Sequence, residues 1–149
     1  SHGGRILVMA TPMTLKQEKF QNLLAKYREQ ADIVPVQCDG LMEFVEHGDL
    51  DGQELDDYFA EKLSPVLTDD TESIVLGCTH YPFLLPVFRQ VIGERGVAVV
   101  DPSPAVGRRV GQLLDQYDLR AEKGAAANYG FLTFADEAYR SRLECKAFG

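Results

Sequence analysis

Short apolar runs alternate along the chain with segments whose apolar residues recur at helical spacing, and this alternation limits the folds open to it. The apolar runs expected to form strands are 5–11, 31–38, 72–78, 96–102 and 128–135. The helices expected between and after them are 14–27, 39–46, 55–63, 81–92, 103–117 and 136–149. Strands that alternate with helices predict an α/β fold, with a parallel sheet covered by helices on both faces.

Sequence features of two expected strands indicate where each strand lies in the sheet. The continuous run Ile74-Val75-Leu76 is typical of a strand buried on both faces. Pro35 has no N–H to donate to a neighbouring strand, so the strand over 31–38 is expected at an edge.

Candidate caps mark where several helices begin and end. Thr14 and Gln17 have the spacing of a capping box, and Asp39 is expected to cap the next helix, with Gly48 as its stop. Ser103 is expected to be an N-cap, because the proline behind it suits the first helical position.

Length and charge narrow the class of protein. A chain of 149 residues suits one domain, and a net charge of −8 without a basic block argues against a nucleic-acid partner. No apolar run approaches the length of a membrane span, so no membrane partner is expected. The three cysteines, Cys38, Cys78 and Cys145, are odd in number and far apart, which favours a reducing cytoplasm over a disulfide framework.

Polar residues follow several expected strands, at the edge where parallel sheets bind ligands. The richest group is Cys78-Thr79-His80, after the strand over 72–78. The positive end of a following helix would stabilise a Cys78 thiolate, which could take a proton or attack a carbon. Thr79 offers a hydroxyl and a backbone N–H to a carboxylate, and His80 could relay a proton.

These residues by themselves leave other readings open. A single cysteine such as Cys78 is often a small buried apolar group, and a Cys-x-His pair is a weak zinc signal. Cys38 and His47 could complete a metal site, although nothing in their spacing favours it. Glu46 by itself is an ordinary solvated acid.

Longer stretches resemble a known family. The motif "LGCTHYPFLLP" (76–86) resembles the second cysteine motif of glutamate racemases, in the aspartate/glutamate racemase superfamily. The stretch "VQCDGLMEFVEHG" (36–48) resembles the family segment that carries an assisting acid. The segments "VMATPMTLKQEKF" (8–20) and "VVDPSPAVGRRV" (99–110) are similar to family segments in the same order.

The resemblance implies an isomerase that interconverts L- and D-glutamate for peptidoglycan synthesis, with neither a metal nor another cofactor. Cys78 would be one of two acid/base cysteines that face opposite sides of the substrate α-carbon. Thr79 would bind the substrate, His80 would support proton transfer at Cys78, and Glu46 would assist in the same neighbourhood.

The resemblance also implies a domain division. Residues 1–104 would be the second α/β domain of the enzyme, and 105–149 a segment that returns to a first domain. That first half, with its opposite cysteine, is absent from the sequence, so the chain alone is expected to be inactive. Its expected partners are glutamate and the N-terminal half of the enzyme.

Apolar residues in and after the last long helix would then lack a covering surface. This predicts a homodimer, an exchange of this segment between copies, or a tail that folds back on its own domain. The apolar residues are Val106, Val110, Leu113, Leu114, Tyr117, Phe131, Leu132 and Phe134. Two alternatives to the glutamate racemase stay open. One is a non-catalytic module that binds an acidic metabolite, and the other is a different amino-acid racemase of the superfamily.

Overall fold

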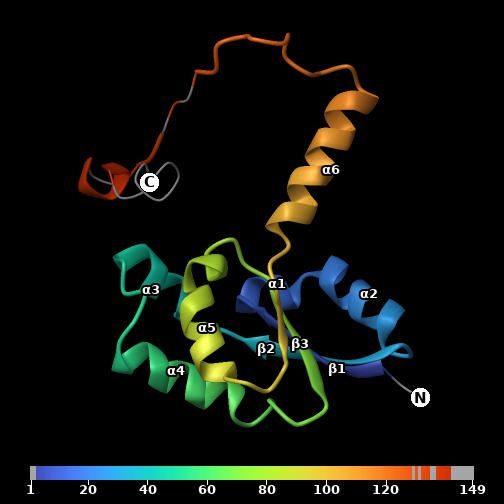
Figure 1. The fold of residues 1–149 in the computed structure, drawn as a ribbon, viewed down its shortest axis with the longest axis vertical. Coiled ribbons are helices and arrows are strands. Elements are labelled where there is room, and N and C mark those ends of the chain that lie inside the picture. Colours follow the sequence, from blue (N-terminus) through green and yellow to red (C-terminus); the bar gives the residue numbers. More distant parts are fainter. Residues whose placement is uncertain (1–2, 129, 131, 135–136, 142–149) are drawn as a thin grey trace. The chain divides into compact units, whose positions relative to one another are not determined.

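The computed structural model describes residues 3–128, 130, 132–134 and 137–141. It contains two compact units, Ser1–Gly111 and Gln112–Gly149, and the sheet lies in the first. The strands of this sheet are β1 (Gly3–Ala10), β2 (Ala31–Gln37), β3 (Thr71–Leu76) and β4 (Ala98–Val100). All their pairings are parallel, in the order β2-β1-β3-β4 (Figure 1).

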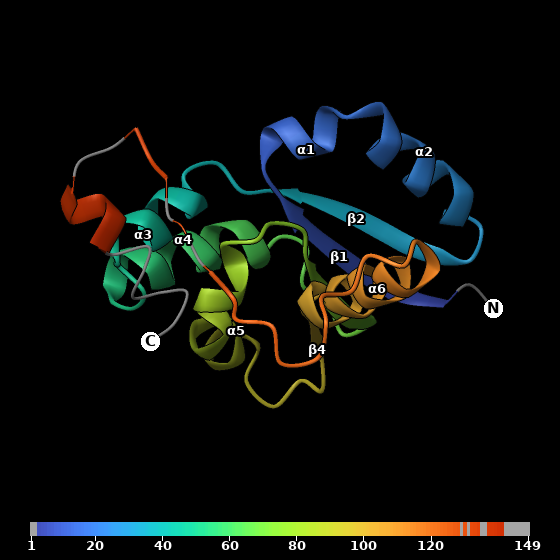
Figure 2. The same cartoon turned by 90° about the horizontal axis from the view of Figure 1, so that it is seen from above.

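The predicted α/β class with a parallel sheet is therefore confirmed. Figure 2 shows α1 (Pro12–Lys16) and α2 (Glu18–Tyr27) on one side of the sheet, with α4 (Gln53–Leu63) and α5 (Leu85–Ile92) on the other. The remaining helical elements are α3 (Leu41–His47), the 3₁₀ helix η1 (Tyr81–Leu84) and α6 (Ser103–Gln116).

The position predicted for Pro35 is confirmed. β2 lies at one edge of the sheet, and Pro35 pairs in register with Val8 of β1. A proline is tolerated there because only one side of the strand needs ladder donors.

Three of the predicted caps are wrong. Thr11 caps α1 by accepting the Thr14 N–H on its hydroxyl, at 3.3 Å, and Gln17 is the extended residue between α1 and α2. Gly40 precedes α3 with a left-handed φ of 77°, while Asp39 accepts hydrogen bonds from the Gln37 side chain. A glycine reaches this backbone conformation without steric cost, which aspartate does not.

The third wrong cap is Ser103, which is itself the first residue of α6. Its N–H is accepted by the Asp101 carboxylate at 2.8 Å, and hydrogen bonds from Ser103 lower the pKa of Asp101. The predicted stop at Gly48 is confirmed, because this residue ends α3 with a left-handed φ of 90°.

The helix predicted over 81–92 begins as the 3₁₀ turn η1 before α5. Pro86 has no N–H, so it cannot make the α-helical hydrogen bond to the Pro82 carbonyl. The Leu85 N–H donates to that carbonyl instead, in the tighter 3₁₀ pattern. α5 then ends before Gly93, as predicted.

The strand predicted over 128–135 is not confirmed. Asn128, Gly130 and residues 132–134 belong to no strand, and residues 129, 131 and 135 lie outside the described part of the chain. Residues 137–141 are helical, within the helix predicted over 136–149, whose other residues lie outside the described part.

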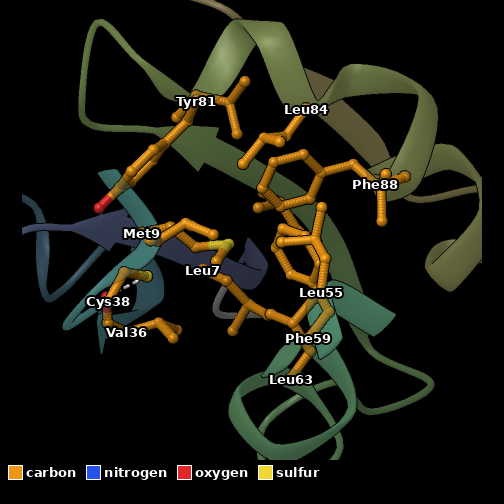
Figure 3. Packing of buried hydrophobic residues seen from close by; sticks show 14 of the residues in the cluster. Leu7, Met9, Val36, Cys38, Leu55, Phe59, Leu63, Tyr81, Leu84 and Phe88 are labelled. Atoms are coloured by element: carbon orange, nitrogen blue, oxygen red, sulfur yellow. Dashed lines mark hydrogen bonds between the residues drawn. The ribbon is translucent and has the colours of Figure 1, made fainter. Parts of the chain in front are cut away.

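The hydrophobic core fills the face of the sheet that α4 and α5 cover. Phe59 and Phe88 meet at its centre, with ring centroids 4.6 Å apart. Figure 3 shows the surrounding side chains, which converge from β1, β2, α4, η1 and α5. They include Leu7, Met9, Val36, Cys38, Leu55, Leu63, Tyr81 and Leu84. The core thus fixes η1, which directly follows His80, against the sheet.

No helix in the described part of the chain has the length and apolar character needed to cross a membrane.

Candidate active site

Gly77 brings the end of β3 close to β1. Its N–H donates to the Met9 carbonyl at 2.7 Å, and a Cβ at this position would lie only 2.7 Å from the same oxygen. Only glycine permits this approach of two backbones. The next residue, Cys78, therefore emerges at the carboxyl edge of the sheet, as predicted, and is partly exposed.

Three predicted site residues lie in one line of contacts. The Cys78 Sγ is 3.6 Å from His80 Nδ1, and His80 Nε2 is 2.7 Å from Glu46 Oε1. The side chains of His80 and Glu46 are 27% and 21% exposed. Glu46 comes from α3, and His80 directly precedes η1, which packs against α3. We call these three residues the Cys78 relay.

The order of the Cys78 relay determines what each nitrogen of His80 can do. An ionised Glu46 only accepts hydrogen bonds, so a neutral His80 donates from Nε2. Nδ1 is then the unprotonated nitrogen, and it faces the Cys78 thiol. A proton can pass from Sγ to Nδ1, and the resulting imidazolium lies against a carboxylate that stabilises it.

Backbone N–H groups beside the thiol have no hydrogen-bond partner in the part of the chain that the structure describes. The N–H groups of Cys78, Thr79 and His80 make no hydrogen bond to other described residues. Thr79 is exposed. These donors are available to a carboxylate or another anionic oxygen.

A cavity of about 300 Å³ opens beside Cys78. Its lining residues are Leu76, Gly77, Cys78, Thr79, Pro102, Ser103 and Val106. The sequence did not indicate that Val106 belongs here, because its helical spacing placed it only in the apolar stripe of a helix. The cavity therefore lies between the segments that follow β3 and β4.

The helix expected directly after Cys78 is not where it was predicted. α5 begins at Leu85, so the first turn after the thiol is the four-residue η1. The prediction that a helix dipole stabilises a Cys78 thiolate is therefore wrong, and His80 is the group that faces the thiol instead.

The other cysteines do not join this site within the described residues. Cys38 is only 1% exposed and donates from its thiol to the Val36 carbonyl, at 3.4 Å. Burial raises its pKa to about 11. Cys38 is therefore packed at a strand end, and Cys145 lies outside the described part of the chain.

A separate cavity of about 580 Å³ lies beyond β1 and β2, and its lining includes Thr11, Cys38 and Asp39. His47 is exposed near the end of α3. Among the residues that the structure describes, no three His, Cys, Asp or Glu side chains gather as a metal site would require.

Comparison with known proteins gives the family. Residues 1–109 match the family model described as Asp/Glu/hydantoin racemase. The chain belongs to this family. It is 42% identical over 125 residues to a glutamate racemase of Clostridium perfringens, a match that covers 84% of this chain and 48% of the relative. The chain thus spans about half the length of the curated relatives that it matches.

Solved structures agree with the fold. The Escherichia coli glutamate racemase, in complex with L-glutamate and the activator UDP-MurNAc-ala, has a TM-score of 0.72 at 22% identity. That match covers 98% of this chain and 55% of the other. The Francisella tularensis glutamate racemase, in complex with D-glutamate, has a TM-score of 0.68 at 23% identity, covering 78% and 43%. At these identities the likeness supports the fold alone.

Proposed function

We propose that this chain supplies one of the two proton-transferring sides of a cofactor-independent glutamate racemase, with Cys78 as the acid/base thiol. The observation that carries the proposal is the Cys78 relay, with Nδ1 of His80 facing the thiol and Nε2 facing Glu46. Membership of the racemase family and similarity to glutamate racemases support the choice of reaction and substrate.

The relay accounts for proton transfer in both directions. When His80 holds the thiol proton, the Cys78 thiolate can remove the α-proton from one face of glutamate. In the reverse direction the thiol returns a proton to the same face. Glu46 is a positioning residue in this scheme, because it acts through His80. General acid–base catalysis of this kind contributes about 10²–10⁴-fold in rate.

Removal of the α-proton places negative charge on the α-carboxylate of the substrate. The N–H groups of Cys78, Thr79 and His80, which bond to none of the described residues, can stabilise that charge, and the Thr79 hydroxyl adds a further donor. We therefore assign Thr79 to substrate binding. None of these steps calls for a metal or an organic cofactor.

Inversion also needs a thiol on the opposite face of the α-carbon. Cys38 is buried in the core, and its thiol donates a hydrogen bond to the Val36 carbonyl, so it cannot be this second thiol. We infer that the second thiol belongs to the first half of the enzyme, that residues 1–104 form the domain carrying Cys78, and that 105–149 return to the first domain. The chain alone should then exchange an α-proton without inverting the carbon.

The biological role follows from the product. D-Glutamate is used in peptidoglycan, so we assign the parent enzyme to cell-wall synthesis. Cys38 and Cys78 are both free thiols in the structure. An acid/base thiol must stay reduced, which favours the cytoplasm as the site of action.

Hydrogen–deuterium exchange at the α-carbon tests the proposal. Each enantiomer of glutamate is incubated with the chain in D₂O, and deuteration and chirality are measured separately. We expect one enantiomer to gain deuterium with retention of configuration. Cys78→Ala should abolish the exchange, and His80→Asn should lower its rate by about 10²-fold or more. Exchange that survives in Cys78→Ala would refute the assignment.

The same experiment separates the alternatives. A glutamate-dependent rise in melting temperature without any exchange would indicate a binding module. Faster exchange of aspartate than of glutamate would indicate another amino-acid racemase of the superfamily. Restored racemisation on adding the first half of the enzyme would support the assignment of the second thiol.

A further inference from the structure

A second chemistry is available to the same thiol, and it needs no second cysteine. We propose that Cys78 is also a nucleophile that hydrolyses activated esters of small, neutral carboxylic acids through a thioester intermediate. Racemisation requires a thiol on each face of a carbon, whereas acyl transfer requires only one. The described residues contain every group that acyl transfer needs.

The first requirement is an activated nucleophile. A thiol or hydroxyl is activated when a base lies within reach and a third group orients that base. Here the base is His80 Nδ1, 3.6 Å from the Cys78 sulfur, and the orienting group is Glu46, 2.7 Å from Nε2. The contacts run in the same order as in the catalytic triads of hydrolases.

The second requirement is a set of donors for the oxygen that becomes negative. When a thiolate attacks an ester, the carbonyl oxygen of the ester becomes an oxyanion, and pairs of backbone N–H groups commonly stabilise it. The N–H groups of Cys78, Thr79 and His80 make no hydrogen bond to other described residues. They belong to the nucleophile and the two residues that follow it.

The third requirement is room for an acyl group beside the sulfur. The cavity at Cys78 has a volume of about 300 Å³. Leu76, Pro102 and Val106 supply apolar lining, and neither lysine nor arginine is among the lining residues. This lining favours an uncharged acyl group and gives no counter-ion to a charged one.

The reaction balances in two steps. The Cys78 sulfur forms a bond to the acyl carbon while the bond from that carbon to the leaving oxygen breaks. The thiol proton passes to His80 Nδ1 and then to the leaving oxygen. Water next attacks the thioester, His80 takes a proton from the water, and that proton returns to the sulfur as the carboxylic acid leaves. The sum is an ester plus water giving an acid plus an alcohol or phenol.

The test uses p-nitrophenyl acetate with the 149-residue chain. We expect p-nitrophenol release with turnover, and one acetyl group mapped by mass spectrometry to the peptide containing Cys78. Cys78→Ala should reduce the rate to that of buffer. Glu46→Gln should slow turnover by about tenfold or more, because it removes the charge that stabilises the imidazolium. Cys38→Ala and Cys145→Ser serve as controls and should retain the activity.

Two results would overturn the proposal. One is acetylation spread evenly over the three cysteines, which would show ordinary thiol reactivity, and it can be read in the unsubstituted chain even if Cys38→Ala fails to fold. The other is acetylation of Cys78 at an unchanged rate in Glu46→Gln. The α-deuteration assay on the same samples keeps the two proposals apart. Exchange at the α-carbon without ester turnover would refute the role of Cys78 as a nucleophile and leave its acid/base role intact.

Discussion

At the scale of single residues, two thiols at the carboxyl edge of one sheet differ in their surroundings. Cys78 is partly exposed and faces a histidine, whereas Cys38 is buried and donates to the Val36 carbonyl. The partly buried Tyr58 and the buried Tyr81 adjoin Cys38, and burial raises the pKa of both phenols as well. Burial in apolar surroundings favours the neutral form of each of these groups.

The raised pKa of Cys38 predicts a loss of stability in alkali. In the unfolded chain the thiol ionises near its ordinary pKa of 9.0, but in the folded chain only near 11. Between these values the unfolded chain binds fewer protons, so the free energy of unfolding falls as the pH rises. At pH 11 this lowers the free energy of unfolding by about 2 kcal/mol. Urea denaturation at a series of pH values measures it.

Cys38→Ala is the matched variant for that measurement. Tyr58 and Tyr81 act in the same direction as Cys38, so the variant should keep part of the alkaline decline and lose the part that begins near pH 9. Identical pH profiles for the variant and the unsubstituted chain would show that the thiol is not responsible.

At the scale of elements, the site depends on how β3 ends and how the chain continues. Gly77 lets β3 approach β1 at the level of Met9, and the following turn places His80 before η1. The buried ring of Tyr81 anchors η1 in the core, as Figure 3 shows. The distance between Cys78 and His80 is thus held by a strand end on one side and a buried aromatic residue on the other.

Gly77→Ala should disrupt this arrangement. The added Cβ would lie 2.7 Å from the Met9 carbonyl oxygen and 3.1 Å from the Ala10 Cβ, so the two strands must separate. We expect the free energy of unfolding to fall by about 1–3 kcal/mol, as for other overpacked sites. Urea denaturation measures the loss, and the α-deuteration rate should fall with it because Cys78 moves.

Gly107→Ala is the control for that substitution. A Cβ at Gly107 in α6 meets nothing within 4 Å, and alanine favours a helix over glycine by about 1 kcal/mol. This variant should be no less stable than the unsubstituted chain. Equal destabilisation by both substitutions would mean that the close approach at Gly77 is not the cause.

At the scale of the whole molecule, large apolar side chains reach the solvent. Val106 and Val110 of α6 are 59% and 50% exposed, and Tyr117 after it is 62% exposed. Leu132 and Phe134 are also exposed, while Phe131 of the same predicted set lies outside the described residues. Exposed apolar residues in such number normally mark an association surface.

Sedimentation velocity tests this expectation. We expect a dimer, with or without exchange of the segment 105–149. The alternative is a compact monomer in which this segment folds back on the domain of its own chain. Val110→Lys should weaken either arrangement, because it places a charge in the apolar stripe. An extended monomer at every concentration, unaffected by Val110→Lys, would contradict the prediction.

Most of the sheet could be predicted from local patterns. Strands such as Ile74-Val75-Leu76 are apolar throughout because both faces are covered, and that is visible in sequence. The predicted caps at Thr14 and Asp39 failed because Thr11, three residues before Thr14, and Gly40, one residue after Asp39, take those positions. Spacing alone does not decide between candidates within one helical turn of each other.

The sequence by itself determined the α/β class, the edge position of Pro35 and the pair Cys78 and His80, because each depends on residues close together in the chain. The family resemblance placed Glu46 in the same neighbourhood, but only the tertiary structure showed its contact with His80 across 34 residues and placed Val106 beside Cys78. It also separated Cys38 from the site by burial. These outcomes depend on which strands lie side by side and on which helices cover them, and a local pattern of residues does not record either.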